Sequence, residues 1–403
     1  MTIGVGGSTA ELELKKLNDM TAGISPVSEA EYAARLAAAQ DLMKELGLGA
    51  VYLNAGSNMT YFTGTRWYAS ERMVGVILPA DGAPEYIAPV FEIGTLKDFM
   101  EVKGPVNGWQ EHESPYALFG EVLRRMGFED GAVGLDESSG FFIFDGLRAE
   151  APACEYLNAK PVTAGCRMHK SETEIALMQR AKDMTIEVHK AAARILRPGI
   201  STTEVCDFID RAHKKVGASG SSFCIVLFGE ATAYPHGVKD PQILKEGDMV
   251  LIDTGCQLMG YNSDITRTYV YGEPTARQRE VWQHEKDAQL AAFEAAQPGT
   301  PCGQVDVAAR RSLESNGYGP DYAAPGLVHR TGHGIGLDIH EWPYLVRSDE
   351  TPLAPGMCFS NEPMISIPGE FGVRLEDHFY MTEDGPRWFT QPSPSIDNPF
   401  GNN

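Results

Sequence analysis

The sequence predicts two domains, an α/β domain over residues 1–165 followed by an α+β domain over residues 166–403. Three observations lead to this class. Helix-like and strand-like segments alternate through the first part, as they do in α/β folds. A long amphipathic segment begins at Ser171 and stops at Pro198 and Gly199. Beyond it, short strand-like runs are separated by Gly and Asp, which favours antiparallel strands.

The first domain begins with residues 28–48, whose apolar side chains have helical spacing. We expect Ser28 to cap the start of this helix and Gly47 to end it. Residues 49–64 contain a short apolar run and then Gly, Asn and Ser, which predicts a strand followed by a loop. Residues 73–91 are typical of two strands joined by an Asp-Gly turn. The order helix, strand, strand, strand supports the α/β class.

The second domain begins with the long helix from Ser171, where Glu174 three residues later completes a capping box. A second helix is expected from Thr202. Strand pairs then continue towards the C-terminus. Residues 391–403 are rich in Pro and show no regular pattern.

The composition is that of a soluble globular protein with a strong acidic excess. Lys and Arg number 34 against 55 Asp and Glu, which gives a formal charge of −21. Such a surface repels phosphate backbones, so we expect no nucleic-acid partner. Residues 1–17 lack the features of a secretory signal, and no apolar run has the length of a membrane span. The seven cysteines include no CxxC pair, so we expect free thiols in a cytoplasmic protein.

Two aspartates stand out between Val250 and Gly272. An apolar run leads into Asp253, and a second strand of alternating type carries Asp264 near its start. Two strands joined by a turn can bring these carboxylates together. Taken alone, both are equally well explained as turn or surface aspartates, because Asp is common in turns.

Three histidines follow, at positions 329, 333 and 340. Small residues around His333 allow a ligand or the backbone to approach closely. A phosphate-binding loop is disfavoured, because no strand–loop–helix unit surrounds the glycines. A zinc motif of the HExxH type starting at His340 is excluded, because Tyr344 replaces the second His and Pro343 interrupts a helix.

Two glutamates complete the set. Glu362 follows an apolar strand, and alternation within one further strand would place Arg374, Glu376 and His378 on the same face. This face alone could be a surface ladder of ion pairs. Together with the two aspartates, however, four carboxylates with apolar flanks would be costly to bury without counter-charge.

Two divalent cations would supply that counter-charge, with four positive charges for four negative ones. The sequence therefore predicts a two-metal site made by Asp253, Asp264, His333, Glu362 and Glu376. The oxygen-rich ligand set favours manganese, with cobalt, iron or catalytic zinc as alternatives, over structural zinc.

At these residues the chain resembles the pita-bread metallopeptidase family, which includes methionine aminopeptidase, aminopeptidase P, prolidase and creatinase. The family's five ligands occur in this order, within DTG, SDITRT, GHGIG, NEP and RLED. The resemblance implies a pita-bread catalytic domain over residues 166–403 and a creatinase-type N-terminal domain over residues 1–165. Length and motifs are most similar to the bacterial Xaa-Pro dipeptidases, which implies an Xaa-Pro dipeptide as the substrate and a homodimer.

The same resemblance suggests roles for residues outside the ligand set. His236 within YPHG resembles a histidine that lines the substrate pocket, and His329 and His340 resemble a pair that contacts substrate and steadies the transition state. Arg374 resembles an arginine that fixes the site and contributes to catalysis. Trp67 lies in a loop of a type that reaches a neighbouring site in related dimers, although a core or surface position is also consistent with its surroundings.

One position departs from the family pattern. Many aminopeptidase P and prolidase members have a tyrosine four residues after the fourth ligand, within EPGxY, whereas this chain has Ser366 there. Any step assisted by a tyrosine hydroxyl at that position would need another donor.

The implied mechanism is attack on the amide by a hydroxide that two metal ions activate. Glu362 is expected to move the proton, and His329 or His340 to stabilise the oxyanion. Arg374 and His236 are the residues expected to bind the substrate carboxylate. Alternatives are an aminopeptidase P-like enzyme, an ectoine-type ring hydrolase or a non-catalytic binding module. A serine or cysteine hydrolase is disfavoured, since GxSxG is absent.

Overall fold

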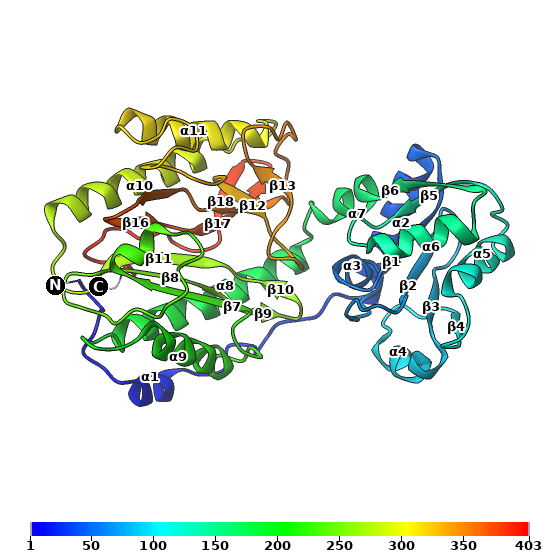
Figure 1. Ribbon diagram of the computed structural model, residues 1–403, viewed down its shortest axis with the longest axis horizontal. Coiled ribbons are helices and arrows are strands. Elements are labelled where there is room, and N and C mark those ends of the chain that lie inside the picture. The colour runs from blue at the N-terminus through cyan, green and yellow to red at the C-terminus, as the bar shows by residue number, and fades with distance from the viewer. Residues whose placement is uncertain (1, 402–403) are drawn as a thin grey trace. The chain divides into compact units, whose positions relative to one another are not determined.

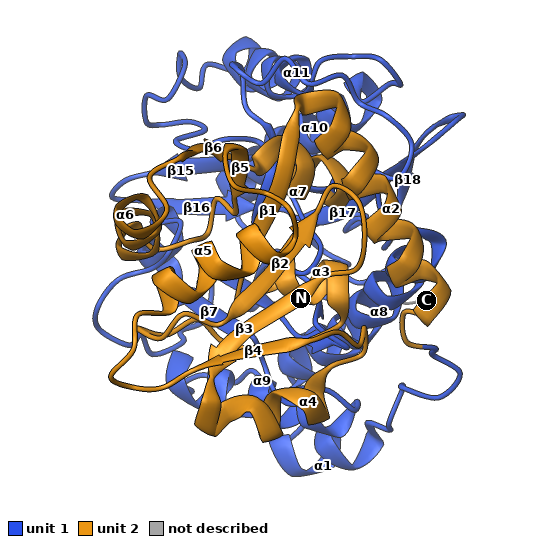
Figure 2. Cartoon of the chain, turned by 90° about the vertical axis from the view of Figure 1, so that its right-hand side faces the viewer, with its two compact units in different colours: residues 1–25, 168–403 blue, residues 26–167 orange. Residues whose placement is uncertain are grey.

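The computed structural model describes residues 2–401, which form two compact units (Figure 2). The small unit comprises residues 26–167, and the large unit comprises residues 2–25 together with 168–401. The predicted boundary near 165 lies close to the observed one, but residues 2–25 belong to the large unit and not to the first domain. Figure 1 labels the helices and strands of both units.

Backbone hydrogen bonds explain why the N-terminal segment joins the large unit. The Thr2 amide donates to the Gly272 carbonyl at 3.0 Å, and the Gly6 amide donates to the Ala193 carbonyl at 2.9 Å. Helix α1 (Ala10–Lys16) then packs against two helices of that unit. These contacts join residues far apart in the chain, so no local pattern could announce them.

The small unit is an α/β domain around one mixed sheet of six strands in the order β4-β3-β2-β1-β5-β6. Strand β1 pairs antiparallel with β2 and parallel with β5. Its core is apolar, with Tyr52, Ile77 and Phe119 fully buried. In chain order the elements are α2 (Glu29–Leu46), β1 (Leu48–Asn54), α3 (Ser57–Thr63), β2 (Gly75–Pro79), β3 (Glu85–Pro89), η1 (Val90–Glu92), α4 (Ile93–Phe99), β4 (Val106–Trp109), α5 (Pro115–Arg125), β5 (Gly131–Leu135), α6 (Phe141–Glu150), β6 (Cys154–Asn158) and α7 (Lys160–Arg167).

Local signals in this unit are largely confirmed. The Ser28 side chain caps α2, and Gly47 ends it in the left-handed conformation with φ of 70°. Strands β2 and β3 form the expected antiparallel pair. The loop expected after β1 is wrong, because residues 57–63 form helix α3. Two turns are too short for a clear helical period, and burial of Met59 and Phe62 stabilises the helix.

The large unit is an α+β domain whose strand pairs are antiparallel. Helices α8 and α9 pack on one side of the strands, and α10 and α11 lie on the other (Figure 1). Its sheets have the orders β11-β8-β7, β13-β12-β14-β17-β18, β15-β16 and β10-β9. After α1 its elements are α8 (Glu172–Arg194), α9 (Thr202–Lys215), β7 (Phe223–Phe228), η2 (Gly229–Ala233), β8 (Met249–Gly255), β9 (Gln257–Leu258), β10 (Tyr261–Asn262), β11 (Ile265–Val270), α10 (Ala276–Ala295), α11 (Cys302–Ser315), β12 (Gly332–Gly334), β13 (Glu341–Leu345), β14 (Cys358–Asn361), β15 (Met364–Ile367), β16 (Phe371–Arg374), β17 (Asp377–Thr382) and β18 (Gly385–Trp388).

The two predicted helices of this unit are confirmed, and the capping box of Ser171 and Glu174 is formed. The single strand expected through residues 373–380 is wrong. The chain leaves one sheet after Arg374 and enters another at Asp377. Between them the Leu375 carbonyl accepts a hydrogen bond from the Gln289 side chain at 3.1 Å, which replaces a bond within a sheet.

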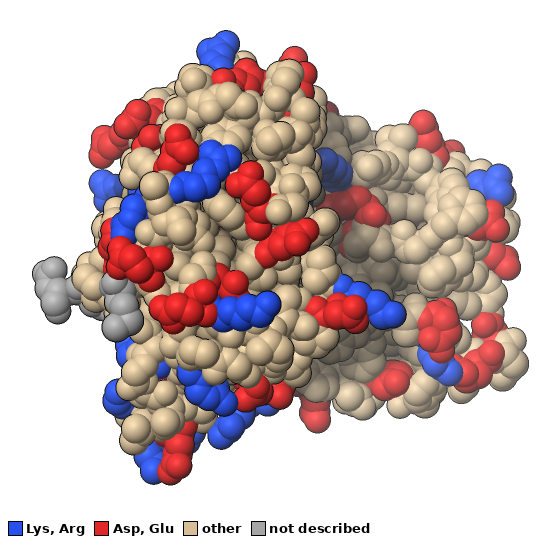
Figure 3. Space-filling view, turned by 60° about the vertical axis from the view of Figure 1, so that its left-hand side comes forward, with Lys and Arg blue, Asp and Glu red and all other residues tan. Residues whose placement is uncertain are grey.

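All seven cysteines are free thiols, and three of them, Cys256, Cys302 and Cys358, are buried. Within residues 2–401, no helix combines the length and the apolar character needed to span a membrane. Acidic and basic side chains are interspersed over the face of the large unit shown in Figure 3.

Candidate metal centre and active site

A cavity of about 680 Å³ lies within the large unit. Its wall combines loops that follow strands with the short strands of both main sheets. The nine residues that the sequence predicts for the site in this unit all line it: His236, Asp253, Asp264, His329, His333, His340, Glu362, Arg374 and Glu376.

Strands β8 and β11 bring the two aspartates together. Asp253 pairs in register with Thr266, so Asp264, two residues earlier, lies beside it at the end of the ladder. Gly255 permits this approach, because a Cβ there would lie 1.8 Å from the backbone oxygen of Ser263. The glycine of the DTG motif is therefore required by the crossing of the two chain segments.

Strands β12 and β14 place His333 against Glu362. The His333 amide donates to the Ser360 hydroxyl at 2.9 Å, and that hydroxyl donates to Glu362 Oε1 at 3.0 Å. His333 Nδ1 lies 3.0 Å from the Gly334 carbonyl. A carbonyl can only accept, so Nδ1 carries a proton, and Nε2 is the nitrogen that a neutral ring would offer to a metal ion.

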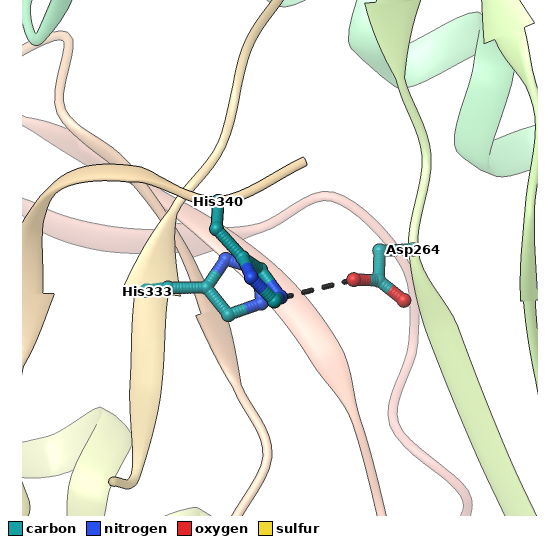
Figure 4. Close-up of side chains that lie close together, drawn as sticks. All are labelled: Asp264, His333 and His340. Carbon is teal, nitrogen blue, oxygen red and sulfur yellow. Dashed lines mark ion pairs between the residues drawn. The ribbon is translucent and has the colours of Figure 1, made fainter. Parts of the chain in front are cut away.

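That nitrogen faces carboxylates. His333 Nε2 lies 3.0 Å from Glu362 Oε1 and 3.7 Å from Asp264 Oδ2. Figure 4 shows the rings of His333 and His340 side by side, both directed towards Asp264. A neutral imidazole nitrogen and a carboxylate oxygen both offer electron pairs, so either a proton or a metal ion lies between them.

Glu376 is the last of the five predicted ligands, and it lies between β16 and β17. Its Oε2 accepts from the Thr266 hydroxyl at 2.7 Å, and its Oε1 lies 3.2 Å from His378 Nε2. Ligand atoms of Asp264, Glu376 and His378, and likewise of His333, Glu362 and Glu376, lie within 4.8 Å of one another. These groups have the size and chemistry of divalent metal sites.

The electrostatics of the carboxylates also indicate a missing positive charge. Burial, and then the charge of Glu376, raises the pKa of Asp264 well above its ordinary value. Burial, and then Glu362, does the same to the pKa of Glu376. Burial raises the pKa of Glu362, but a proton shared with His333 Nε2 lowers it, and the net shift is downward.

Two buried oxygens, Asp253 Oδ1 and Asp264 Oδ1, have no hydrogen-bond partner within residues 2–401. Buried carboxylate oxygens without partners are expensive unless they coordinate an ion. The donor set therefore fits divalent cations that prefer oxygen with one imidazole.

Arg374 is held on three sides. Its guanidinium donates to Asp253 Oδ2 at 2.5 Å, to the Thr266 hydroxyl at 3.2 Å and to the Pro235 carbonyl at 3.0 Å. Only 2% of the residue is exposed. These contacts fix Asp253 and commit every nitrogen of the guanidinium to the protein.

The other histidines of the predicted site also line the cavity. His329 Nδ1 lies 2.7 Å from the Arg330 carbonyl, which leaves Nε2 as a buried acceptor without a partner among the described residues. Burial lowers the pKa of His329. Burial, followed by the charge of His333, lowers the pKa of His340 to about 4. His236 is exposed at the edge of the cavity.

Two residues singled out by the sequence lie elsewhere. Ser366 is buried outside the cavity wall, where its hydroxyl donates to the Ala233 carbonyl at 2.6 Å. Trp67 belongs to the small unit, where its ring meets Phe99 edge-on with centroids 6.3 Å apart. Conversely, Arg330 lines the cavity although no sequence motif pointed to it. Its position in the sequence between two predicted site residues, His329 and His333, could have indicated that it lies near the site.

Comparisons with known proteins agree with this geometry. Residues 176–383 match the model of metallopeptidase family M24, and residues 35–169 match the creatinase/prolidase N-terminal domain. The chain is 38% identical to a probable dipeptidase PepE of Mycobacterium tuberculosis over 362 residues, 88% of this chain and 93% of that protein. It is 32% identical to an Xaa-Pro dipeptidase of Pyrococcus furiosus over 350 residues, 87% and 95% of the two chains.

Solved structures show the same fold. The crystal structure of dipeptidase PepE from Mycobacterium ulcerans matches with a TM-score of 0.83 and 34% identity, covering 92% of this chain and 97% of that one. A prolidase from Thermococcus sibiricus matches with a TM-score of 0.81 and 30% identity, covering 89% and 97%. With the two domain matches and the pita-bread arrangement of the large unit, the chain belongs to metallopeptidase family M24, a family of hydrolases that use divalent metal ions.

Proposed function

We propose that this protein hydrolyses Xaa-Pro dipeptides with two divalent metal ions held by Asp253, Asp264, His333, Glu362 and Glu376. The observation that carries the metal assignment is the position of His333 Nε2, which faces two carboxylates beside unpartnered aspartate oxygens. The dipeptide assignment is supported by the relatives, which include proteins named dipeptidases and Xaa-Pro dipeptidases. Manganese is the proposed metal, with zinc or cobalt as alternatives.

When bound, the ions would polarise the scissile carbonyl and lower the pKa of a bound water. Glu362 would accept the proton at Oε1, the oxygen to which Ser360 already donates. His340 would hydrogen-bond the developing oxyanion, because no described contact occupies its ring nitrogens. His329 would accept a hydrogen bond from substrate, since its proton lies on Nδ1 and Nε2 offers only a lone pair.

The preference for proline has a physical basis. The bond before proline is a tertiary amide without an N–H group, so its burial leaves no donor unsatisfied. A site without an acceptor at that position would favour proline over other residues. A dipeptidase without this preference is the alternative, because the relatives of higher identity are named only as dipeptidases.

A substrate panel tests the proposal. Metal-depleted protein is reconstituted with Mn²⁺, Co²⁺ or Zn²⁺ and assayed on Ala-Pro, Leu-Pro, Ala-Leu, the tripeptide Ala-Pro-Ala and ectoine, a cyclic amidine. Cleavage of Ala-Pro and Leu-Pro well above the other compounds is expected. Equal cleavage of Ala-Leu would favour the broader dipeptidase, and preferred cleavage of the tripeptide would favour an aminopeptidase P-like enzyme.

Variants test the site itself. Asp264→Asn and His333→Ala should abolish cleavage and bind less metal by elemental analysis, with an unchanged circular dichroism spectrum. Asp384→Asn and His112→Ala alter the same residue types at exposed positions and should behave as wild type. Full activity of the wild type after chelation and dialysis would refute the metal assignment.

A further inference from the structure

Arg330 is a cation in the cavity, and no acidic side chain of residues 2–401 forms an ion pair with it. It lines the same wall as His329, His333 and His340. Within residues 2–401, no carboxylate or carbonyl holds its guanidinium. Arg374, the other arginine of the cavity, is committed to Asp253 and two further acceptors. The two arginines therefore differ in function: one is built into the protein, and the other is available to a ligand.

An aromatic ring holds Arg330 in place. Its guanidinium carbon lies 4.3 Å from the ring centroid of Tyr344. Tyr344 is directly opposite His333 in the β12–β13 ladder, and its amide donates to Asp349 Oδ2 at 2.9 Å. Stacking orders the guanidinium but uses none of its N–H groups. The N–H groups of the Arg330 guanidinium are thus held in place by a ring opposite His333, and no acceptor among residues 2–401 binds them.

A dipeptide cleaved at the predicted metal site would bring its C-terminal carboxylate into the same cavity. Only one residue separates the scissile carbonyl from the C-terminus, a reach of at most about 3.6 Å along the chain. The four ligand carboxylates would repel an anion there, so its binding needs a cation. Arg330 is three residues from His333 and lines the same cavity.

We propose that Arg330, stacked on Tyr344, binds the C-terminal carboxylate of the dipeptide and so selects free dipeptides over amides and longer peptides. The inference rests on the proposed dipeptidase function. It changes the sequence-based expectation, in which Arg374 and His236 were to bind this carboxylate. A guanidinium matches a carboxylate with two parallel hydrogen bonds, which gives geometric selectivity as well as affinity.

The test compares Ala-Pro with Ala-Pro amide, which lacks the negative charge. In the wild type, kcat/KM should favour the acid by about 10- to 100-fold, as expected for a charge-assisted contact. Arg330→Gln should reduce this ratio to near one, mainly by raising KM for the acid, because the contact is made in the ground state and the transition state alike. Arg330→Lys should retain part of the preference.

Two further measurements separate this role from general damage. Inhibition by L-proline, the carboxylate product, should weaken in Arg330→Gln by a similar factor. Tyr344→Leu should raise KM for the acid several-fold, whereas Tyr344→Phe, which keeps the ring, should have a KM close to that of the wild type. Arg347→Gln is the matched control, since Arg347 is exposed, pairs with Asp321 and lies outside the cavity.

The outcomes distinguish the two proposals. An Arg330→Gln variant that keeps the wild-type ratio of acid to amide overturns the role of Arg330 and leaves the dipeptidase function standing. A wild type that cleaves no free dipeptide overturns both.

Discussion

Replacing Arg374 with methionine tests whether the metal centre is organised by a buried ion pair. Methionine retains much of the apolar length but removes the cation and its hydrogen bonds to Asp253, Thr266 and Pro235. Asp253 is 7% exposed and would lose its fixed counter-charge. Removing one partner of a buried pair typically costs about 3–5 kcal/mol. Protonation of Asp253 removes its unpaired charge and so limits the loss of stability. We therefore expect a loss near the lower end of this range at acidic pH and near the upper end at pH 8.

The assay is urea unfolding of metal-depleted protein, so that no bound ion compensates for the lost charge. Intrinsic fluorescence reports the transition, because Trp282 is buried in the same unit. Arg347→Met is the control, since it removes an Arg–Asp pair whose side chains are 48% and 61% exposed. Exposed pairs contribute little to stability. A loss in Arg374→Met no larger than in Arg347→Met would refute the reasoning.

Three further predictions concern stability and metal binding. Burial lowers the pKa of His213 to about 4, so the neutral ring stabilises the fold fully above the unfolded-state pKa near 6.5, and this stability is lost as the pH falls towards 4. Between pH 7 and pH 5 the free energy of unfolding should fall by about 2 kcal/mol on this account. Urea unfolding of His213→Gln should show a smaller pH dependence. Ser366→Ala should cost about 1 kcal/mol through the lost bond to Ala233, with kcat and KM unchanged; a changed kcat would contradict its position outside the cavity. The Gln289 side chain donates to Leu375 and Asp377, on either side of Glu376. Gln289→Leu should therefore weaken Mn²⁺ binding about tenfold in calorimetric titration, whereas exposed Gln283→Leu on the same helix should not.

Local signals determined much of this protein. Helix caps such as Ser28 and Ser171 act through hydrogen bonds to residues three positions away, so sequence alone could place those helix starts. The five expected ligands also stood out, because acidic residues and a histidine among apolar and glycine flanks are costly without a shared cation. The structure brings all five to one cavity.

Long-range contacts decided the rest. Residues 2–25 join the large unit through backbone bonds to segments around Ala193 and Gly272, which no local pattern encodes. The short helix α3 is stabilised by the burial of its side chains, because seven residues are too few to show a helical spacing of apolar positions. Within a single stretch, Arg374 and Asp377 belong to different sheets, and Gln289, far away in sequence, binds the backbone between them.

The two arginines of the cavity show the difference most clearly. From sequence, Arg374 was singled out by a motif, whereas no motif drew attention to Arg330. The tertiary structure surrounds Arg374 with acceptors and places Arg330 on the ring of Tyr344 with its donors unused. Sequence specifies which charges a chain carries, but only packing determines which of them are neutralised by the protein and which remain available for a substrate.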